Sequence, residues 1–401
     1  MEYLIFIVLL YETAITSILG FSYIDELILL FLFICFFCKI LKDKKIILTK
    51  NEFFILWGSI GIYCIGIISL LVFNISDNIK GSLFSGLLSL KSILTYIFVR
   101  YLFKDSKFRY NELFLKFTQF GLFCVFLLSL VDRVIPIFKR GSKRFGIYTT
   151  SLFFETPTML ATFAIISLII CTFLIRILNK KEKNLYIDVF MSLVIVLFAG
   201  RVKAIGFMIL YLIVIFYKKF FKSNRGIKIK NFIIPLIIVI CFASGYIENY
   251  FFNNTESRTI MLNTSIKIAK DYFPLGTGFG TFGTEMSRKY YSPLYSLYNI
   301  SKVWGLSREF DSYIADSMLP AIIAETGFIG LAFYIFIFIN FFINISKNVK
   351  NKDNQILLFL LIFYVLIECV ADTLLMTSRG MLLFAFMAFI TNYDLNKEEE
   401  K

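Results

Sequence analysis

The chain has 401 residues, of which 58% are hydrophobic and 49 are phenylalanine, and its mean hydropathy is +0.76. Soluble domains are about 45–50% apolar, so this composition excludes a soluble globular enzyme and predicts an all-α, polytopic membrane protein. The formal net charge is +14 and histidine is absent, which excludes histidine-based catalysis and any serine–histidine dyad.

Apolar runs near the roughly 20 residues that cross a bilayer as a helix recur along the chain. They predict one polytopic membrane domain over residues 1–401 with about twelve spans. The first run continues into the second without a small-residue cleavage site, so we expect no cleaved signal peptide. The predicted spans cover residues 2–20, 23–41, 52–73, 83–103, 113–131, 153–178, 185–199, 202–217, 231–247, 319–345, 356–376 and 380–392.

Every second connection between these spans is rich in lysine and arginine, from the stretch 42–50 to the stretch 347–352. The positive-inside rule places those connections and both termini in the cytoplasm. Residues 248–318 then form a large external loop, which we expect to fold over a site as helices and turns. The outward connections 132–150 and 199–203 are basic as well, against the rule, which favours capture of an anionic ligand there.

The seven cysteines all lie within apolar segments. We therefore expect buried, small hydrophobic side chains rather than disulfide or metal chemistry. The sequence predicts no metal site and no cofactor.

The external loop contains "PLGTGFGTFG" at residues 274–283, a literal GxGxxG. That fingerprint binds dinucleotides only between a strand and a helix of a βαβ unit, and none is predicted here. The glycines, Gly278 and Gly280 among them, instead indicate a tight turn or a close backbone approach. We expect no nucleic acid or nucleotide partner.

Arginine on the outer face of a membrane protein suits phosphate, because the guanidinium matches phosphate oxygens in a two-pronged contact. The alternative for each arginine is ordinary surface charge or headgroup contact. Arg201 lies between two short spans, where a charge is costly, so function is favoured there. The external candidates are Arg133, Arg140, Arg144, Arg201, Arg258, Arg288, Arg308 and Arg379, and Lys203 is beside Arg201.

Carboxylates supply a possible base. Asp311 and Asp316 end the large loop, and Asp316 precedes Glu325 by nine residues in "DSMLPAIIAETGFIG". An aspartate near positive charge is ionised and available to remove a proton. Asp316 also suits a helix N-terminus, and the two roles are compatible.

Glu368 and Asp372 are one helical turn apart in a predicted span, on one helix face. Intramembrane acids of this kind serve function or pair with a cation such as Arg379 or Lys91. The loop aromatics, Tyr291 among them, suit either sugar stacking or anchoring at the membrane interface.

Four segments together resemble the O-antigen ligase and O-antigen polymerase superfamily of bacterial envelope enzymes. They cover roughly the last two-thirds of the chain; the first third carries no matching motif. The segments are "KRFGIYTTSLFFETPTMLATF", "FAGRVKAIGFMIL", "ESRTIMLNTSIKIAKDYFPLGTGFGTFG" and "DSMLPAIIAETGFIGL".

The resemblance implies a GT-C-like glycosyltransferase architecture in the bacterial cytoplasmic membrane with its active site on the outer face. The implied reaction transfers a glycan from an undecaprenyl-pyrophosphate carrier to an acceptor hydroxyl. By the same resemblance, Arg201 and Arg258 hold phosphate, Arg144 is a weaker candidate, and Asp316 activates the acceptor. The remaining substrate-binding candidates are Arg140, Lys203, Asp311, Glu325, Tyr291, Arg379, Gly278 and Gly280. Implied partners are the lipid-linked oligosaccharide, membrane lipids and a chain-length regulator protein.

Ligases of this superfamily carry His-Asn where this chain has Asp316-Ser317. A carboxylate there resembles the polymerase branch, in which the acceptor is another lipid-linked repeat unit. The alternatives are a ligase that transfers the glycan to a different acceptor, and a flippase for the same lipid-linked units. A peptidoglycan glycosyltransferase fits the motifs less well.

Overall fold

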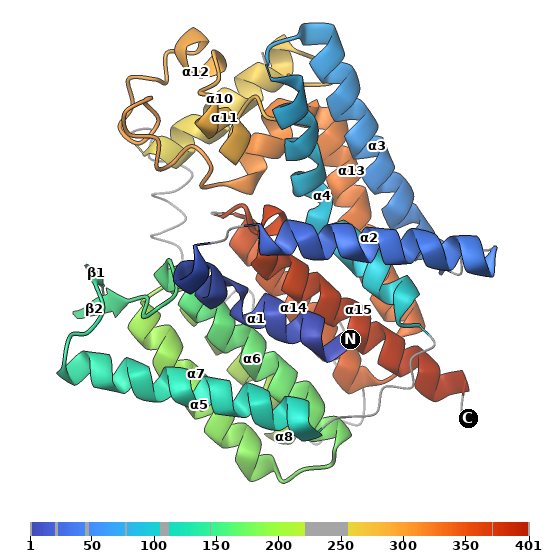
Figure 1. The fold of residues 1–401 in the computed structure, drawn as a ribbon, viewed down its shortest axis with the longest axis vertical. Helices are drawn as coiled ribbons and strands as arrows, with labels where there is room; N and C mark the ends of the chain where they lie inside the picture. Colours follow the sequence, from blue (N-terminus) through green and yellow to red (C-terminus); the bar gives the residue numbers. More distant parts are fainter. Residues whose placement is uncertain are drawn as a thin grey trace.

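The computed structural model describes residues 2–20, 23–44, 48–76, 78–104, 112–144, 146–220, 256–370 and 372–399. The described part is mostly helical (Figure 1). Each predicted span overlaps a helix except residues 231–247, which lie outside the described residues.

The first half of the chain contributes eight helices and one hairpin to the described residues. They are α1 (Glu2–Leu19), α2 (Ile24–Asp43), α3 (Lys50–Phe73), α4 (Ile79–Leu102), α5 (Glu112–Val134), β1 (Arg140–Arg144), β2 (Ile147–Thr150), α6 (Pro157–Ile177), α7 (Glu182–Ala199) and α8 (Val202–Phe220).

The second half contributes the loop helices and the last long helices. They are α10 (Ser257–Asp271), α11 (Glu285–Lys289), α12 (Leu294–Leu297), α13 (Met318–Asn348), α14 (Lys352–Cys369), the 3₁₀ turn η2 (Leu374–Met376) and α15 (Ser378–Glu399).

Among the described residues, five helices are long and apolar enough to cross a membrane: α3, α4, α5, α6 and α13. The chain is therefore an all-α, multi-pass membrane protein in outline, and twelve spans stay a prediction. One predicted span, 356–376, is interrupted, because α14 ends at Cys369 and a separate 3₁₀ turn follows at Leu374–Met376.

Polar caps define where several long helices begin. Thr49 and Glu52 form a capping box at the start of α3, with the Thr49 N–H donating to Glu52 Oε2 over 2.8 Å. Thr156 caps α6, whose first residue is Pro157, a residue suited to that position. Such caps satisfy N–H groups that the helix itself leaves without a partner.

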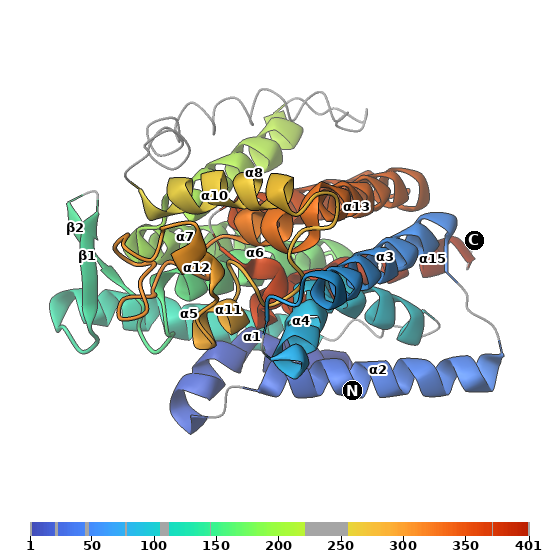
Figure 2. The same ribbon diagram turned by 90° about the horizontal axis from the view of Figure 1, so that it is seen from above.

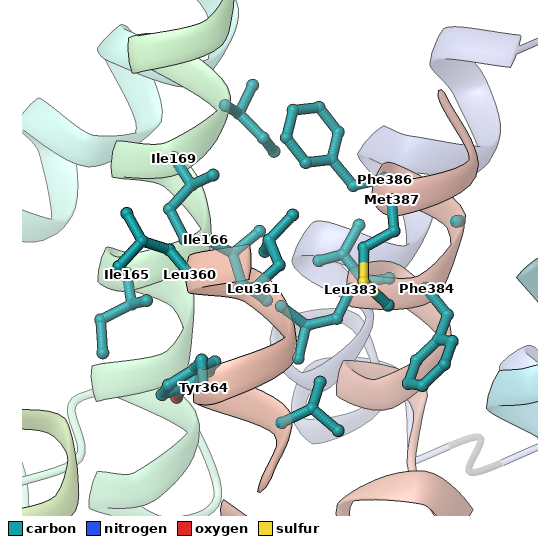
Figure 3. Packing of buried hydrophobic residues seen from close by; sticks show 14 of the residues in the cluster. Ile165, Ile166, Ile169, Leu360, Leu361, Tyr364, Leu383, Phe384, Phe386 and Met387 are labelled. Carbon is teal, nitrogen blue, oxygen red and sulfur yellow. The ribbon is translucent and has the colours of Figure 1, made fainter. Parts of the chain in front are cut away.

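The main core lies where α6 meets α14 and α15. Figure 3 shows Ile165, Ile166 and Ile169 of α6 facing side chains of the other two helices. In α6, every residue from Leu160 to Ile175 is buried inside the protein. A helix that is apolar on all sides is stable only when surrounded, so α6 is a central helix of the bundle.

The loop region α10–α12 has a small core of its own. Phe282, Leu294, Tyr295, Leu306 and Ile314 are almost fully buried there. This region packs on α13 and α4. Figure 2 shows α10–α12 and the β1–β2 hairpin towards the same end of the molecule, with the C-terminal end of α15 towards the other.

The hairpin is an element that the helical prediction missed. Its strands run antiparallel, with Lys143 opposite Tyr148 and Arg144 opposite Ile147. Gly146 takes φ +79° in its turn, a conformation that glycine adopts without strain. The hairpin base is held by Asp132, whose Oδ1 accepts from the N–H of Phe138 over 2.9 Å and whose Oδ2 accepts from Thr150 Oγ1 over 3.0 Å.

Candidate functional site

Charged side chains from five separate segments come together next to the loop region α10–α12. They come from the starts of α8, α10 and α15, from the residues before α13, and from the end of α14 and the turn after it. Three ion pairs tie these segments together: Arg258 with Asp316, Lys203 with Glu368, and Arg379 with Asp372. We call these six residues the ionic cluster.

Arg258 and Asp316 form the most accessible pair of the cluster. The guanidinium Nη2 of Arg258 donates to Asp316 Oδ2. Both side chains are partly exposed, at 26% for Arg258 and 29% for Asp316. The guanidinium also lies 5.7 Å from the centre of the Tyr313 ring, a distance typical of a cation–π contact.

The other two pairs lie deeper. Lys203 Nζ is 2.8 Å from Glu368 Oε2, and that carboxylate side chain is 2% exposed. Arg379 Nη2 is 2.8 Å from Asp372 Oδ2. Arg379 as a whole is 8% exposed, yet its Nε and Nη1 have no hydrogen-bond partner within the described part of the chain. Buried donors without acceptors are costly, so this arginine is suited to an added acceptor such as an anion.

The three pairs act on one another electrostatically. Lys203 and Asp372 both influence the Asp316 carboxyl, and Thr373 Oγ1 lies 3.5 Å from the backbone oxygen of Ala315. Burial raises the pKa of Asp316 above its ordinary value, and the Arg258 guanidinium opposes that shift without cancelling it. Desolvation therefore outweighs the nearby cations in setting the direction of this pKa shift, and the ionised carboxylate stays a prediction.

The N-termini of four helices, with their partial positive charge, also lie in this region, since α8, α10, α13 and α15 begin at or next to residues of the ionic cluster. At α10 and α13 the capping residues, Glu256 and Ser317, make no side-chain cap. Amide N–H groups at those ends are thus not occupied by the cap side chain. Helix N-termini favour anions, which adds to the cationic side chains.

Arg201 and Arg144 lie at the edge of this region. Arg201 immediately precedes α8, two residues before Lys203. A Cβ added to Gly200 would lie 2.6 Å from Thr149 Cγ2 and 3.7 Å from Arg144 Cβ. The hairpin therefore packs directly against the Arg201 segment, and it brings Arg144 there.

Arg140 has a structural role rather than a place in the ionic cluster. Its Nη2 donates to the backbone oxygen of Asp132 over 3.0 Å and to that of Arg133 over 3.3 Å. These bonds fasten the start of β1 to the end of α5. We therefore leave Arg140 out of the candidate site.

Glu325, Gly278 and Gly280 belong to a buried joint between the loop and α13. Glu325 Oε1 accepts from the N–H of Thr281 over 2.9 Å, from the N–H of Phe282 over 3.2 Å and from Thr284 Oγ1 over 3.1 Å. Gly278 and Gly280 have φ +88° and +73°, and both are buried. A Cβ at Gly278 would lie 2.7 Å from the Leu70 backbone. The expected close backbone approach is confirmed, and the joint explains these residues without a ligand.

Tyr291 and Asp311 are not brought into the ionic cluster. Tyr291 Oη donates to the Leu306 backbone oxygen over 2.9 Å inside the loop core. Asp311 influences the Glu285 carboxyl, which pairs with Arg288 at 2.7 Å. Both residues therefore support or border the loop region.

The acidic pair Glu368 and Asp372 is more central than its sequence position suggested. The two residues do not share a helix face as the spacing predicted, because α14 ends at Cys369, before Asp372. Asp372 pairs with Arg379, one of the two cations expected for it, while Glu368 pairs with Lys203. Lys91, the other expected cation, instead pairs with Asp25 and Glu26 of α2. The signal that pointed to Glu368 and Asp372 was the cost of a carboxylate inside an apolar segment.

Comparison with protein-family models and with curated proteins finds no match for the chain.

Proposed function

We propose that the chain is a membrane glycosyltransferase that polymerises lipid-linked oligosaccharide repeat units. Its donor would carry a polyprenyl pyrophosphate, and its acceptor would be the hydroxyl of a second repeat unit. The observation that carries this proposal is the ionic cluster: cations and helix N-termini gathered around one partly exposed carboxylate, Asp316. The resemblance of four sequence segments to the O-antigen ligase and polymerase superfamily supports it.

In the proposed reaction, the acceptor oxygen attacks the anomeric carbon of the donor sugar. The bond from that carbon to the pyrophosphate oxygen breaks, and the pyrophosphate leaves with the electron pair. Negative charge therefore develops on a diphosphate. Arg258, Lys203 and Arg379, together with the adjacent Arg201 and Arg144, supply fixed positive charge for it, which lowers the barrier by electrostatic preorganisation. Guanidinium stays protonated throughout.

Asp316 would remove the proton from the acceptor hydroxyl. A base of this kind contributes about 10²–10⁴-fold in rate. Its raised pKa suits the role, because a carboxylate that holds protons more tightly is a stronger base. The carboxylate in place of the histidine of ligases resembles the polymerase branch, and this resemblance favours the polymerase over the ligase.

A purified preparation of the full chain tests the proposal. It is reconstituted in vesicles with a synthetic undecaprenyl-pyrophosphate repeat unit, and the products are separated by size. We expect a ladder of polymers. Arg258→Gln should shorten the ladder or slow its formation at least tenfold, about 1.4 kcal/mol. Arg308→Gln, an exposed loop arginine outside the cluster, is the matched control and should leave the ladder intact.

The alternatives give different outcomes in the same vesicles. Transfer of the glycan only to a different added acceptor indicates a ligase. Movement of the lipid-linked unit across the bilayer without new glycosidic bonds indicates a flippase. A ladder of wild-type length from Arg258→Gln would contradict the assigned phosphate contact.

A further inference from the structure

The ionic cluster is electrically balanced as it stands. Each of its three cations holds one carboxylate within ion-pair distance. A diphosphate brings at least two negative charges into this space. Like charges at close range in a partly buried site repel strongly, so a cation of the cluster that both a carboxylate and the diphosphate can reach favours the more highly charged diphosphate.

Replacing the carboxylate by a diphosphate is least costly at the Arg258–Asp316 pair. Both members are partly exposed, whereas the Glu368 side chain is 2% exposed and that of Arg379 is 9% exposed. Exposed pairs are held weakly because water screens them. Diphosphate oxygens match a guanidinium at least as well as a single carboxylate does.

The ion pair also engages the carboxylate that serves as the base in the proposed reaction, Asp316. Asp316 Oδ2 accepts from Arg258, so the ion pair engages this oxygen. A base must reach the proton that it removes, over about 2.6–3.2 Å between heavy atoms. Asp316 therefore has to separate from Arg258 before it contacts an acceptor hydroxyl through that oxygen.

We infer that the Arg258–Asp316 ion pair is an autoinhibitory contact: the donor diphosphate takes Arg258 from Asp316, which releases Oδ2 and makes the carboxylate a stronger base once the donor is bound. This inference rests on the proposed function. Loss of the guanidinium and arrival of a negative ligand both strengthen Asp316 as a base. The charged groups around it are Arg258 from α10, Lys203 from α8 and Asp372 after α14.

Binding of inorganic pyrophosphate to the purified full chain in detergent, measured by calorimetry, tests the exchange. In the wild type, pyrophosphate must compete with Asp316 for Arg258. Asp316→Asn removes the competitor, so we expect binding about tenfold tighter than in the wild type. Glu309→Gln removes an exposed carboxylate of the same loop and should leave the affinity unchanged.

A double-mutant cycle separates the exchange from general charge repulsion. Arg258→Gln should weaken binding, and adding Asp316→Asn to it should give a much smaller gain than in the wild type, because no guanidinium remains to be released. Equal gains in both backgrounds would leave only charge repulsion and overturn the inference. Unchanged or weaker binding by Asp316→Asn, or no binding by any variant, would overturn it as well.

This experiment does not depend on polymerisation. If vesicles give no ladder but the cycle shows the exchange, the anion site stands and the glycosyltransferase proposal fails. If a ladder forms but Asp316→Asn does not bind pyrophosphate more tightly, only the autoinhibitory contact fails.

Discussion

Asp316 experiences two opposing influences, burial that favours the protonated form and an arginine that favours the ionised one. Burial is the larger, so the pKa of this carboxyl is raised. The balance differs from a surface aspartate, whose pKa is about 3.9. Activity that needs the ionised carboxylate should therefore decline at a higher pH than an ordinary aspartate would allow.

The sign of that pH dependence can be checked in variants. The kcat/KM of polymerisation, which reports the unliganded enzyme, should fall as pH is lowered through the raised pKa of Asp316. Arg258→Gln removes the influence that lowers this pKa, so the acidic limb should move to higher pH. An acidic limb that stays in place in Arg258→Gln would contradict the assignment of Asp316 as the base.

The structure also assigns different roles to residues that the sequence could not tell apart. Arg140 and Arg258 both stand in stretches that are predicted to be external, and they are equal candidates by residue type. Only the fold separates them: one donates to backbone oxygens at a helix end, and the other meets a carboxylate 58 residues away. Lys203 and Glu368 are 165 residues apart, and no local pattern encodes such a pairing.

At the scale of elements, α13 and the glycine-rich segment 276–283 form one joint. Gly327 has φ +64° and ψ −168° and breaks α13. The N–H groups of Thr277 and Gly278 donate to the oxygens of Ala324 and Glu325, each over 2.9 Å. These bonds supply partners for helix carbonyls that the break would otherwise leave unpaired. The role of the literal GxGxxG is thus to hydrogen-bond the interrupted helix α13 rather than to bind a nucleotide.

A second contact fixes the same segment on the bundle. Phe279 is 1% exposed. Its ring contacts α3 and α4, each at a glycine. A Cβ at Gly66 would lie 2.1 Å from the Phe279 ring, and one at Gly86 would lie 2.5 Å from it. The ring of Tyr63 stacks on Phe279 at 5.9 Å. Because Gly66 and Gly86 have no side chains, the Phe279 ring fits between α3 and α4.

The joint predicts a large effect for Glu325→Ala. This change removes the acceptor of three buried donors, and each donor left without a partner costs about 1–3 kcal/mol. We expect a loss of at least about 3 kcal/mol in the free energy of unfolding, seen as a lower midpoint of thermal unfolding in detergent. Glu325→Gln keeps one oxygen acceptor and should lose less.

Glu285→Ala is the control for that measurement. Its side chain is 58% exposed and pairs with Arg288 three residues on, an arrangement worth about 0–1 kcal/mol. Equal midpoints for Glu325→Ala and Glu285→Ala would mean that the joint does not stabilise the fold.

At the scale of the whole molecule, the helix positions were predictable and the hairpin was not. Long apolar runs bounded by capping residues are strong signals, as Thr156-Pro157 before α6 illustrates. The β2 strand has four residues, too few for a period-2 pattern to stand out beside long spans. The convergence of five segments on Asp316 depends on tertiary packing, which the sequence indicated only through isolated charges in apolar or external stretches.

The arrangement of the bundle also predicts which connections share a side of the membrane. The hairpin lies towards the end that carries α10–α12 (Figure 2), and the basic connection before α14 is predicted to be cytoplasmic. In intact cells, a membrane-impermeant maleimide should label Ser142→Cys, while Lys352→Cys should react only after permeabilisation. The parent chain gives the background from its own cysteines. Labelling of both variants in intact cells would overturn the predicted orientation.

The break at Gly327 divides α13 into two pieces with different attachments. The short piece 318–326 is bonded to the segment 276–284, whereas the rest of the helix continues along α3. Asp316 stands two residues before the short piece. Its position therefore depends on the contacts that join the loop region α10–α12 to the start of α13, and a rigid-body shift of that region together with the short piece would carry the carboxylate along with it.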